Sequence, residues 1–405
     1  MGITIFKYPK LSPLWIAVFI DIIGFSMILP MAPFIAESFS IPIFIMGIIL
    51  SINAMFSFIF GPILGKLSDK FGRRPLLLIS QAGTFAGFLM LAFSNSIWLL
   101  IISRIIDGLF GGNFPIAKAI IGDEVPPKDR GIQMANIGVA HVLASLIGPG
   151  LGGILFSIGG LLYPGLFAAG LSLSTMIITF SILNETWPKE KRELNHELKK
   201  TIVIDIRKNK GAMWYLTLWG FHTASFMIAM ASLSFFAQIV FGLEAFEIGV
   251  LLMISGIFRA VVRFTLFKPT IMKIGENNAI KVGLAMFLIS FFLVGFSINL
   301  VMFFILIMSI SFAASLTRGP LNSKISQSVS PMEQGKINGY SSGLDSFAQI
   351  IGPLLGTFML NFFTPYFLSF LISSVALVPF LMGFKTIQLK KYDIPRLSQE
   401  KLIKE

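Results

Sequence analysis

Five ionisable side chains lie within stretches of the sequence that are otherwise almost wholly apolar. These residues are Asp21, Arg104, Asp107, His141 and Asp345. If the stretches cross a bilayer, each charge near its middle costs about 2.5–3.5 kcal/mol, so each is expected to face a cavity or a partner. Desolvation favours the protonated form of a carboxylic acid, and a nearby guanidinium favours its anion. The five residues therefore predict a site that exchanges protons or binds a charged ligand.

Arg104 and Asp107 are three residues apart and would share one face of a helix. They could neutralise each other as a self-contained pair, or they could couple proton movement to ligand binding. Asp21 has no comparable partner on its own helix, so we expect Asp21 to be the acid that carries a proton or contacts a substrate.

Three further ionisable residues lie in apolar stretches. We expect His222 to be a hydrogen-bonded packing residue of its helix. Arg259 and Arg318 lie close to helix ends, and their long side chains could reach the membrane surface from there.

The composition excludes a soluble protein. The chain has 405 residues, of which 55% are hydrophobic and only 13% are charged, whereas soluble domains average about 25% charged residues. This excludes a cytosolic enzyme, a secreted enzyme and a disordered protein. Because the chain has no cysteine, disulfides and thiolate metal sites are also excluded. No catalytic constellation, cofactor site or metal site is evident, so we do not expect an enzyme.

Twelve segments are long and apolar enough to cross a bilayer as helices. They are 13–35, 44–65, 75–94, 97–120, 131–157, 160–184, 211–239, 245–267, 278–297, 299–325, 334–362 and 364–386. The termini and the loops after the even-numbered segments are rich in Lys and Arg, whereas the remaining loops have neither. The positive-inside rule then predicts that both termini are cytoplasmic. This topology accounts for the net charge of +12 without any binding of nucleic acid.

The two halves of the chain resemble each other. The stretch from Val125 to Gly152 aligns without a gap with residues 329–356, an offset of 204 that makes His141 equivalent to Asp345. We expect these two residues to line a cavity; their helices need not touch across it, so no ion pair between them is implied. The repeat predicts a bundle of six helices over 1–184, a cytoplasmic linker at 185–210, a second bundle of six over 211–386 and a cytoplasmic tail at 387–405.

The loop after the second segment reads Gly65-Lys-Leu-Ser-Asp69-Lys-Phe-Gly72-Arg73-Arg74. It resembles the signature loop of the major facilitator superfamily, G-x-x-x-D-x-x-G-R-R. Three further motifs resemble the drug/proton antiporter branch of that family, which includes tetracycline antiporters. The first is Asp21 to Gly24 followed by Pro30 and Pro33, and the second is Arg104 to Gly108. The third is the glycine-rich run Gly148-Pro149-Gly150-Leu151-Gly152-Gly153.

The resemblance implies an all-α membrane protein of twelve helices in two pseudo-symmetric six-helix bundles, which works by alternating access. It implies that Gly65, Asp69, Gly72, Arg73 and Arg74 form a conformational gate. The residues Gly148, Pro149, Gly152 and Gly153 would form a hinge, although small residues at these positions could equally serve close helix packing.

The function implied is proton-coupled export of an amphiphilic or cationic small molecule. The partners expected are that substrate, protons and the lipid bilayer of the cell membrane, with no need for an oligomer. Two alternatives remain open: a uniporter or proton symporter for a sugar or another metabolite, and a receptor or scaffold that does not transport.

Overall fold

The structure, a computed structural model, describes residues 8–111, 113–190, 209–329 and 333–385, which form helices and short connections without any strand. The helices up to residue 190 are η2 (Pro9–Leu11), α1 (Ser12–Ser38), α2 (Ile43–Phe71), α3 (Arg73–Ala92), α4 (Ile97–Leu109), α5 (Asn113–Glu124), α6 (Pro127–Gly159) and α7 (Leu162–Ile182). From residue 209 onward they are α9 (Lys210–Phe241), α10 (Ala245–Thr265), α11 (Phe267–Val294), α12 (Leu300–Gln327), α13 (Gln334–Phe362) and α14 (Pro365–Gly383).

Twelve helical segments in these described ranges are long and apolar enough to cross a bilayer, which confirms the predicted fold class. Two segments differ from the prediction. The fourth is interrupted between α4 and α5. The ninth begins at Pro269 instead of 278, because α11 includes a short helical stretch before the non-helical turn at Gly275, where φ is 78°. The polar residues around Gly275 made the start of α11 look like a loop in the sequence.

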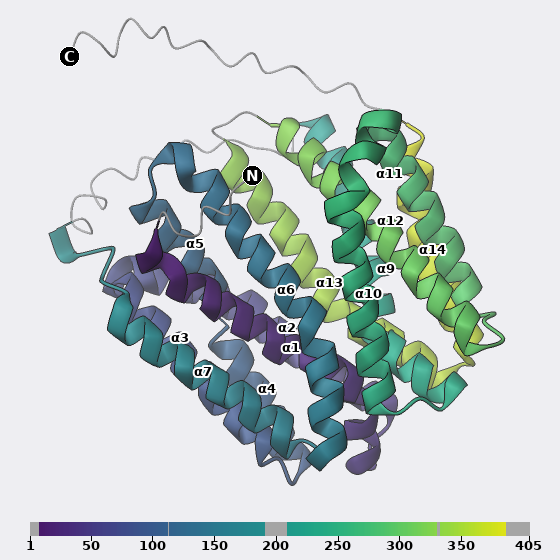
Figure 1. The fold of residues 1–405 in the computed structure, drawn as a ribbon, viewed down its shortest axis with the longest axis horizontal. Coiled ribbons are helices and arrows are strands. Elements are labelled where there is room, and N and C mark those ends of the chain that lie inside the picture. Colours follow the sequence, from purple (N-terminus) through teal and green to yellow (C-terminus); the bar gives the residue numbers. More distant parts are fainter. Residues whose placement is uncertain (1–7, 112, 191–208, 330–332, 386–405) are drawn as a thin grey trace, which may run out of the picture.

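The helices form two groups (Figure 1). In the first, here called the N-half, α1 packs against α6 and α7, and α3 packs against α4 and α7. In the second, the C-half, α9 packs against α13 and α14, and α11 packs against α12 and α14. The main contacts between the halves are those of α6 with α10 and of α2 with α13, and α1 also contacts α9 and α10. The exact bounds of the two bundles stay a prediction, since 191–208 and 386–405 lie outside the described residues.

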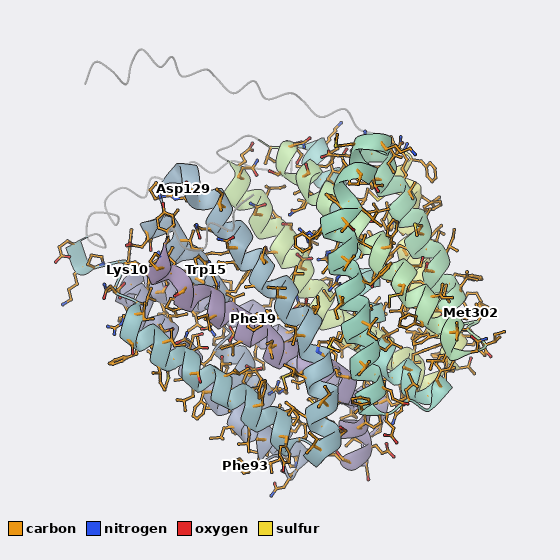
Figure 2. All side chains as sticks on the ribbon, viewed as in Figure 1. Lys10, Trp15, Phe19, Phe93, Asp129 and Met302 are labelled. Carbon is orange, nitrogen blue, oxygen red and sulfur yellow. The ribbon has the colours of Figure 1, made fainter. Side chains whose placement is uncertain are left out.

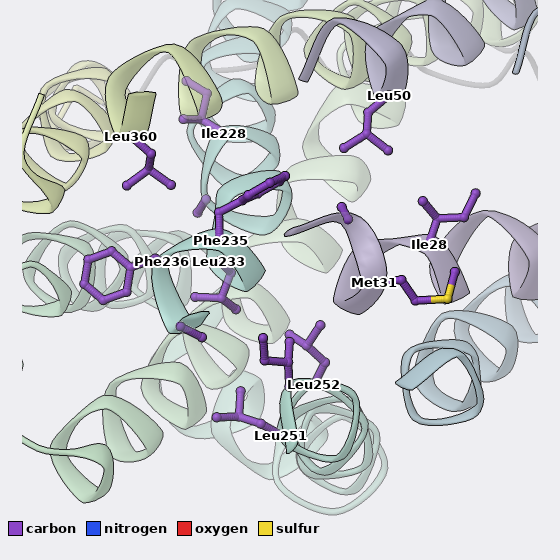
Figure 3. Close-up of a cluster of buried hydrophobic side chains, with 14 of the residues drawn as sticks. Ile28, Met31, Leu50, Ile228, Leu233, Phe235, Phe236, Leu251, Leu252 and Leu360 are labelled. Atoms are coloured by element: carbon purple, nitrogen blue, oxygen red, sulfur yellow. The ribbon is translucent and has the colours of Figure 1, made fainter. Parts of the chain in front are cut away.

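Helix α1 begins and α14 ends on the same side of the molecule, which we call the inner side (Figure 1). The halves meet toward the opposite, outer side. The largest apolar cluster combines Ile28, Met31 and Leu50 of the N-half with Phe235 and Leu252 of the C-half (Figure 3). This shared core holds the outer ends of the helices together.

Hydrogen bonds also join the halves toward the outer side. They run from Gln238 Nε2 to Glu37 Oε2 (3.2 Å), from the Phe44 N–H to Asn361 Oδ1 (3.4 Å) and from Ser51 Oγ to the Ile350 carbonyl (2.7 Å). Toward the inner side, by contrast, one buried cluster contains only N-half residues and another contains only C-half residues. The structure is therefore closed toward the outer side, with separate cores toward the inner side.

The periphery of the molecule carries mostly carbon (Figure 2). Trp98, Phe264 and Ile298 are 72%, 76% and 86% exposed. In water, so much exposed apolar surface would favour aggregation, whereas in a bilayer it contacts lipid tails. The main-chain polar groups meanwhile find partners within each helix, as a membrane span requires.

Candidate functional site

Asp21 is held by an amide from another helix. Asn113 Nδ2 donates a hydrogen bond of 2.6 Å to Asp21 Oδ2. Asn113 is the first residue of α5, where the fourth span resumes after its interruption. Its Oδ1 atom is buried and has no hydrogen-bond partner among the described residues. The residue that follows the interruption thus holds the carboxyl group through a neutral amide donor.

Arg104 and Asp107 form the ion pair that their spacing predicts, with Arg104 Nη1 at 3.3 Å from Asp107 Oδ2. Asn53 of α2 donates to the same carboxylate oxygen at 2.8 Å. The two charged side chains are 3% and 12% exposed. Because Arg104 Nη2 has no hydrogen-bond partner in the described part of the chain, the pair leaves one donor of the guanidinium available.

Asp345 faces a guanidinium in the C-half. Arg318 Nη2 lies 3.6 Å from Asp345 Oδ1, and both side chains are about one-third exposed. The Arg318 guanidinium also lies over the rings of Trp219 (5.1 Å) and Phe226 (5.3 Å), an arrangement stabilised by cation–π attraction. The expectation that Arg318 reaches the membrane surface is therefore wrong, because the acid and the two rings hold it inside the bundle.

His141 is an exposed residue of α6 on which the charges of Arg318 and Arg259 act. Arg318 is therefore a neighbour of both His141 and Asp345, the two positions that the internal repeat relates. Among the described residues, no ion pair joins His141 to Asp345. Their roles in binding or coupling stay predictions.

His222 packs against an aromatic ring. The side chain is fully buried, and its ring centroid lies 4.8 Å from that of Phe287. Neither ring nitrogen has a hydrogen-bond partner among the described residues. The expected hydrogen bond is thus wrong, because α11 presents an aromatic ring at this level instead of an acceptor.

Three functional candidates escaped the sequence analysis. Asn53 and Asn113 are uncharged, so a search for charges in apolar segments passes over them. Lys118 of α5 lies near the predicted end of its segment, where a lysine is expected at the membrane surface. In the structure its Nζ lies 4.1 Å from the centre of the Phe114 ring, and its charge interacts with that of Asp345 in the other half.

A pocket lies between the halves, where helices α1, α2, α4, α9 and α13 meet. Its lining includes Phe25, Ile28, Leu29, Met227, Met230 and Pro353. Only Asn53, Arg104 and Gln349 contribute polar side chains. Such a lining suits an apolar body held in place by a few polar contacts. Among the described residues, no group of three or more His, Cys, Asp or Glu side chains could hold a metal ion.

The predicted gate loop is an ion-paired turn between α2 and α3. Arg73 contacts Asp69 at 2.6 Å and Asp123 of α5 at 2.8 Å. Gly72 adopts a φ of 106°, which side chains disfavour and glycine allows. The structure thus brings the signature residues together, and their gating role stays a prediction.

The start of α3 is capped by the beginning of the connector between the halves. Glu185 accepts hydrogen bonds from the backbone N–H groups of Arg73 (2.9 Å) and Arg74 (3.3 Å). Arg74 Nη2 in turn donates to the carbonyl of Phe180 at 2.6 Å. At the other end of the motif, the Gly65 carbonyl accepts a hydrogen bond from Ser68.

The predicted hinge glycines are positions of close helix contact. A Cβ atom at Gly148 would overlap Ser26 of α1, and one at Gly152 would overlap the Met27 backbone. These two glycines therefore pack α6 against its own half. This supports the packing interpretation and leaves the hinge interpretation a prediction.

Gly153 packs α6 against the other half. A Cβ atom there would overlap the Ala245 carbonyl of α10, and Gly249 lies opposite. The Pro149 carbonyl in turn approaches Gly249. The backbones of the two halves are therefore in close contact at this point.

The chain was compared with known proteins. A family model described as Major Facilitator Superfamily matches residues 14–271. The chain is 28% identical over 357 residues to the class H tetracycline resistance protein of Pasteurella multocida, a match that covers 86% of this chain and 88% of that protein. It is 29% identical over 363 residues to the multidrug resistance protein MdtG of Proteus mirabilis (strain HI4320), covering 85% and 87%. The fold of this chain is similar to that in the crystal structure of a D-xylose-proton symporter, with a TM-score of 0.76 and 14% sequence identity. The match covers 94% of this chain and 98% of the symporter chain.

Proposed function

Because the chain belongs to the Major Facilitator Superfamily, we propose that it exports an amphiphilic small molecule in exchange for protons. The observation that carries this proposal is Asp21, an acid within the helix bundle whose hydrogen-bond partner is a neutral amide. An acid held in this way can take up and release a proton without breaking an ion pair. The resemblance to tetracycline and multidrug resistance proteins supports the direction of transport.

The transport cycle follows from the way the halves meet. With the outer ends closed, we infer that a substrate reaches the pocket between the halves from the inner side. Rocking of the halves about the contacts of α6 with α10 and of α2 with α13 would open it toward the outer side. A substrate in the pocket contacts the free donor of Arg104 and thereby shifts the balance of charge around Asp107. Asp107 is close enough for its charge to act on Asp21, so substrate binding and proton binding influence each other.

The pocket favours an amphiphilic substrate over a sugar. A sugar would require many amide and hydroxyl groups around it, and the lining supplies only Asn53, Arg104 and Gln349. All residues used in this scheme come from one chain, so the scheme needs no oligomer. A transporter of this kind acts on a small molecule and carries out no reaction on it.

We place both termini in the cytoplasm and the protein in the cell membrane, on the basis of the Lys and Arg asymmetry of the loops. The native chain has no cysteine, so single cysteines report the topology directly. In intact cells Ser96→Cys should react with a membrane-impermeant maleimide, and Lys200→Cys should react only after permeabilisation. The reverse pattern would overturn the orientation.

Transport itself is tested in inverted membrane vesicles with an imposed pH gradient and a mixed panel of amphiphilic compounds. We expect at least one compound to accumulate above its equilibrium level, and to leave again when a protonophore dissipates the gradient. Vesicles that lack the protein serve as the control for passive partitioning. Accumulation that is unaffected by the protonophore would contradict proton coupling.

A further inference from the structure

The two halves face each other with an excess of positive charge near the inner side of the pocket. Lys118 comes from the N-half, and Arg259, Arg263 and Arg318 come from the C-half. Electrostatic interactions connect Arg318 to Arg263, Arg259 to both of these, and Lys118 to Asp345. The four cationic side chains are thus connected to one another or to the Asp345 carboxylate, and the charges of Arg318 and Arg259 also act on His141.

Three of these cations, Lys118, Arg259 and Arg263, form no ion pair among the described residues. Asp345 is paired with Arg318 and forms no ion pair with Lys118 in the same part of the chain. Arg259 lies within α10, about 9 Å from its inner end at a rise of 1.5 Å per residue. Unpaired charges at such a depth are costly, and those retained usually mark a ligand or ion pathway.

The cationic cluster continues into the apolar pocket along two helix faces. On α13, Gln349 of the pocket lies one turn beyond Asp345, and on α9 Met230 of the pocket lies one turn beyond Phe226, which contacts Arg318. Residues four apart share a face of a helix. An elongated molecule could therefore place an apolar body in the pocket and a charged group in the cluster.

We propose that Lys118, Arg259 and Arg318 form a binding subsite for the anionic group of the transported molecule, such as a carboxylate or sulfonate. The substrate would then be an amphiphilic anion. This inference rests on the proposed transport function and specifies its substrate class.

An anion bound in this subsite would also favour closure of the two halves around the substrate. Closing the inner side brings Lys118 of the N-half toward Arg259 and Arg318 of the C-half. Juxtaposed like charges oppose such a movement. A bound anion removes this repulsion, so closure is favoured when the subsite is loaded.

The test compares two probes that share a ring system and differ in charge, naphthalene-2-sulfonate and 2-naphthylmethylammonium. Binding to the purified full-length protein in detergent is measured by isothermal titration calorimetry, with empty micelles as the blank. We expect the sulfonate to bind at least about tenfold more tightly than the ammonium. Equal affinities, or a preference for the ammonium, would overturn the proposal.

Variants locate the subsite. Arg259→Gln and Lys118→Gln should each weaken sulfonate binding by about tenfold, the loss typical of one charge-assisted hydrogen bond. Arg259→Lys keeps the charge and should retain most of the affinity, which shows that the helix remains folded. Lys273→Gln removes an exposed cation of α11 outside the cluster and should have no effect. Unchanged sulfonate affinity in both glutamine variants would overturn the assignment.

The binding experiment contains no proton gradient, so its outcome is independent of the transport test. If the sulfonate binds as described but no compound accumulates in a pH gradient, the export function fails and the anion subsite stands. If a compound accumulates and the probes show no preference for the anion, the subsite fails and the export function stands.

Discussion

The two halves hold their membrane-embedded charges in different ways. In the N-half, amide groups of Asn113 and Asn53 donate hydrogen bonds to Asp21 and Asp107. In the C-half, Arg318 is held by aromatic rings of α9 and by one acid. An amide can remain hydrogen-bonded to a carboxyl group in either protonation state, whereas an arginine on aromatic rings stays charged. From this contrast we propose that proton exchange takes place in the N-half and that the C-half contributes most of the recognition of substrate charge.

The turns at the inner ends of the two halves also differ in the charged side chains they carry. Gly72 and Gly275 occupy equivalent places and both adopt positive φ angles. In the N-half, Asp69 forms an ion pair with Arg73 of the turn. In the C-half, the equivalent position is Met272, which is 77% exposed. The repeat thus preserves the backbone of the turn and keeps its acidic side chain in only one half.

The largest effect is expected for Asp21→Asn. The variant keeps the shape of the side chain and cannot exchange a proton, so uphill export should be abolished while downhill exchange persists. The measurement is substrate uptake into inverted vesicles with and without a pH gradient. Glu247→Gln, which changes an exposed acid at the start of α10, is the matched control and should transport normally.

A strong effect is also expected for Gly153→Leu at the contact between α6 and α10. The added side chain would overlap the Ala245 backbone, and overpacking of this kind typically costs about 1–3 kcal/mol. Transport should fall by about tenfold or more. Gly170→Leu on α7 is the control, because a Cβ atom there meets nothing within 4 Å. Similar loss in both variants would show that the contact between the halves is not special.

A smaller effect is expected for Asp69→Asn in the gate turn. Asp69 is partly exposed and Arg73 also contacts Asp123, so the lost pair is worth about 1 kcal/mol and transport should fall about fivefold. Protein level in the membrane should remain normal, as measured by immunoblotting. The matched change in the C-half, Met272→Asn, should leave transport unaffected. Normal transport by Asp69→Asn would make the turn merely structural.

The smallest effect on coupling is expected for Asp345→Asn. Removing this acid leaves Arg318 without its counter-ion but does not touch the Asp21 region. Relative uptake of anionic and cationic compounds should therefore change, while accumulation driven by the pH gradient remains. Competition assays with the compound panel measure this ratio. Loss of accumulation for every compound would contradict the division of roles between the halves.

The sequence predicts the fold more completely than the site. Twelve apolar segments, alternating loop charges and an internal repeat suffice for the architecture, because a bilayer allows few alternatives for a spanning chain. The pair of Arg104 and Asp107 follows from helical spacing alone. The contact between Asn113 and Asp21 could not be predicted, because it depends on the interruption between α4 and α5 and on the packing of that span against α1.

The most direct test of the account is a recording of proton movement with a pH-sensitive dye trapped in proteoliposomes, started by an imposed gradient of a transported compound. We expect the wild type and Asp345→Asn to move protons against the direction of the substrate. Asp21→Asn should move no protons while it still exchanges labelled substrate. Proton movement by Asp21→Asn at the rate of the wild type would contradict the claim that the N-half carries the proton.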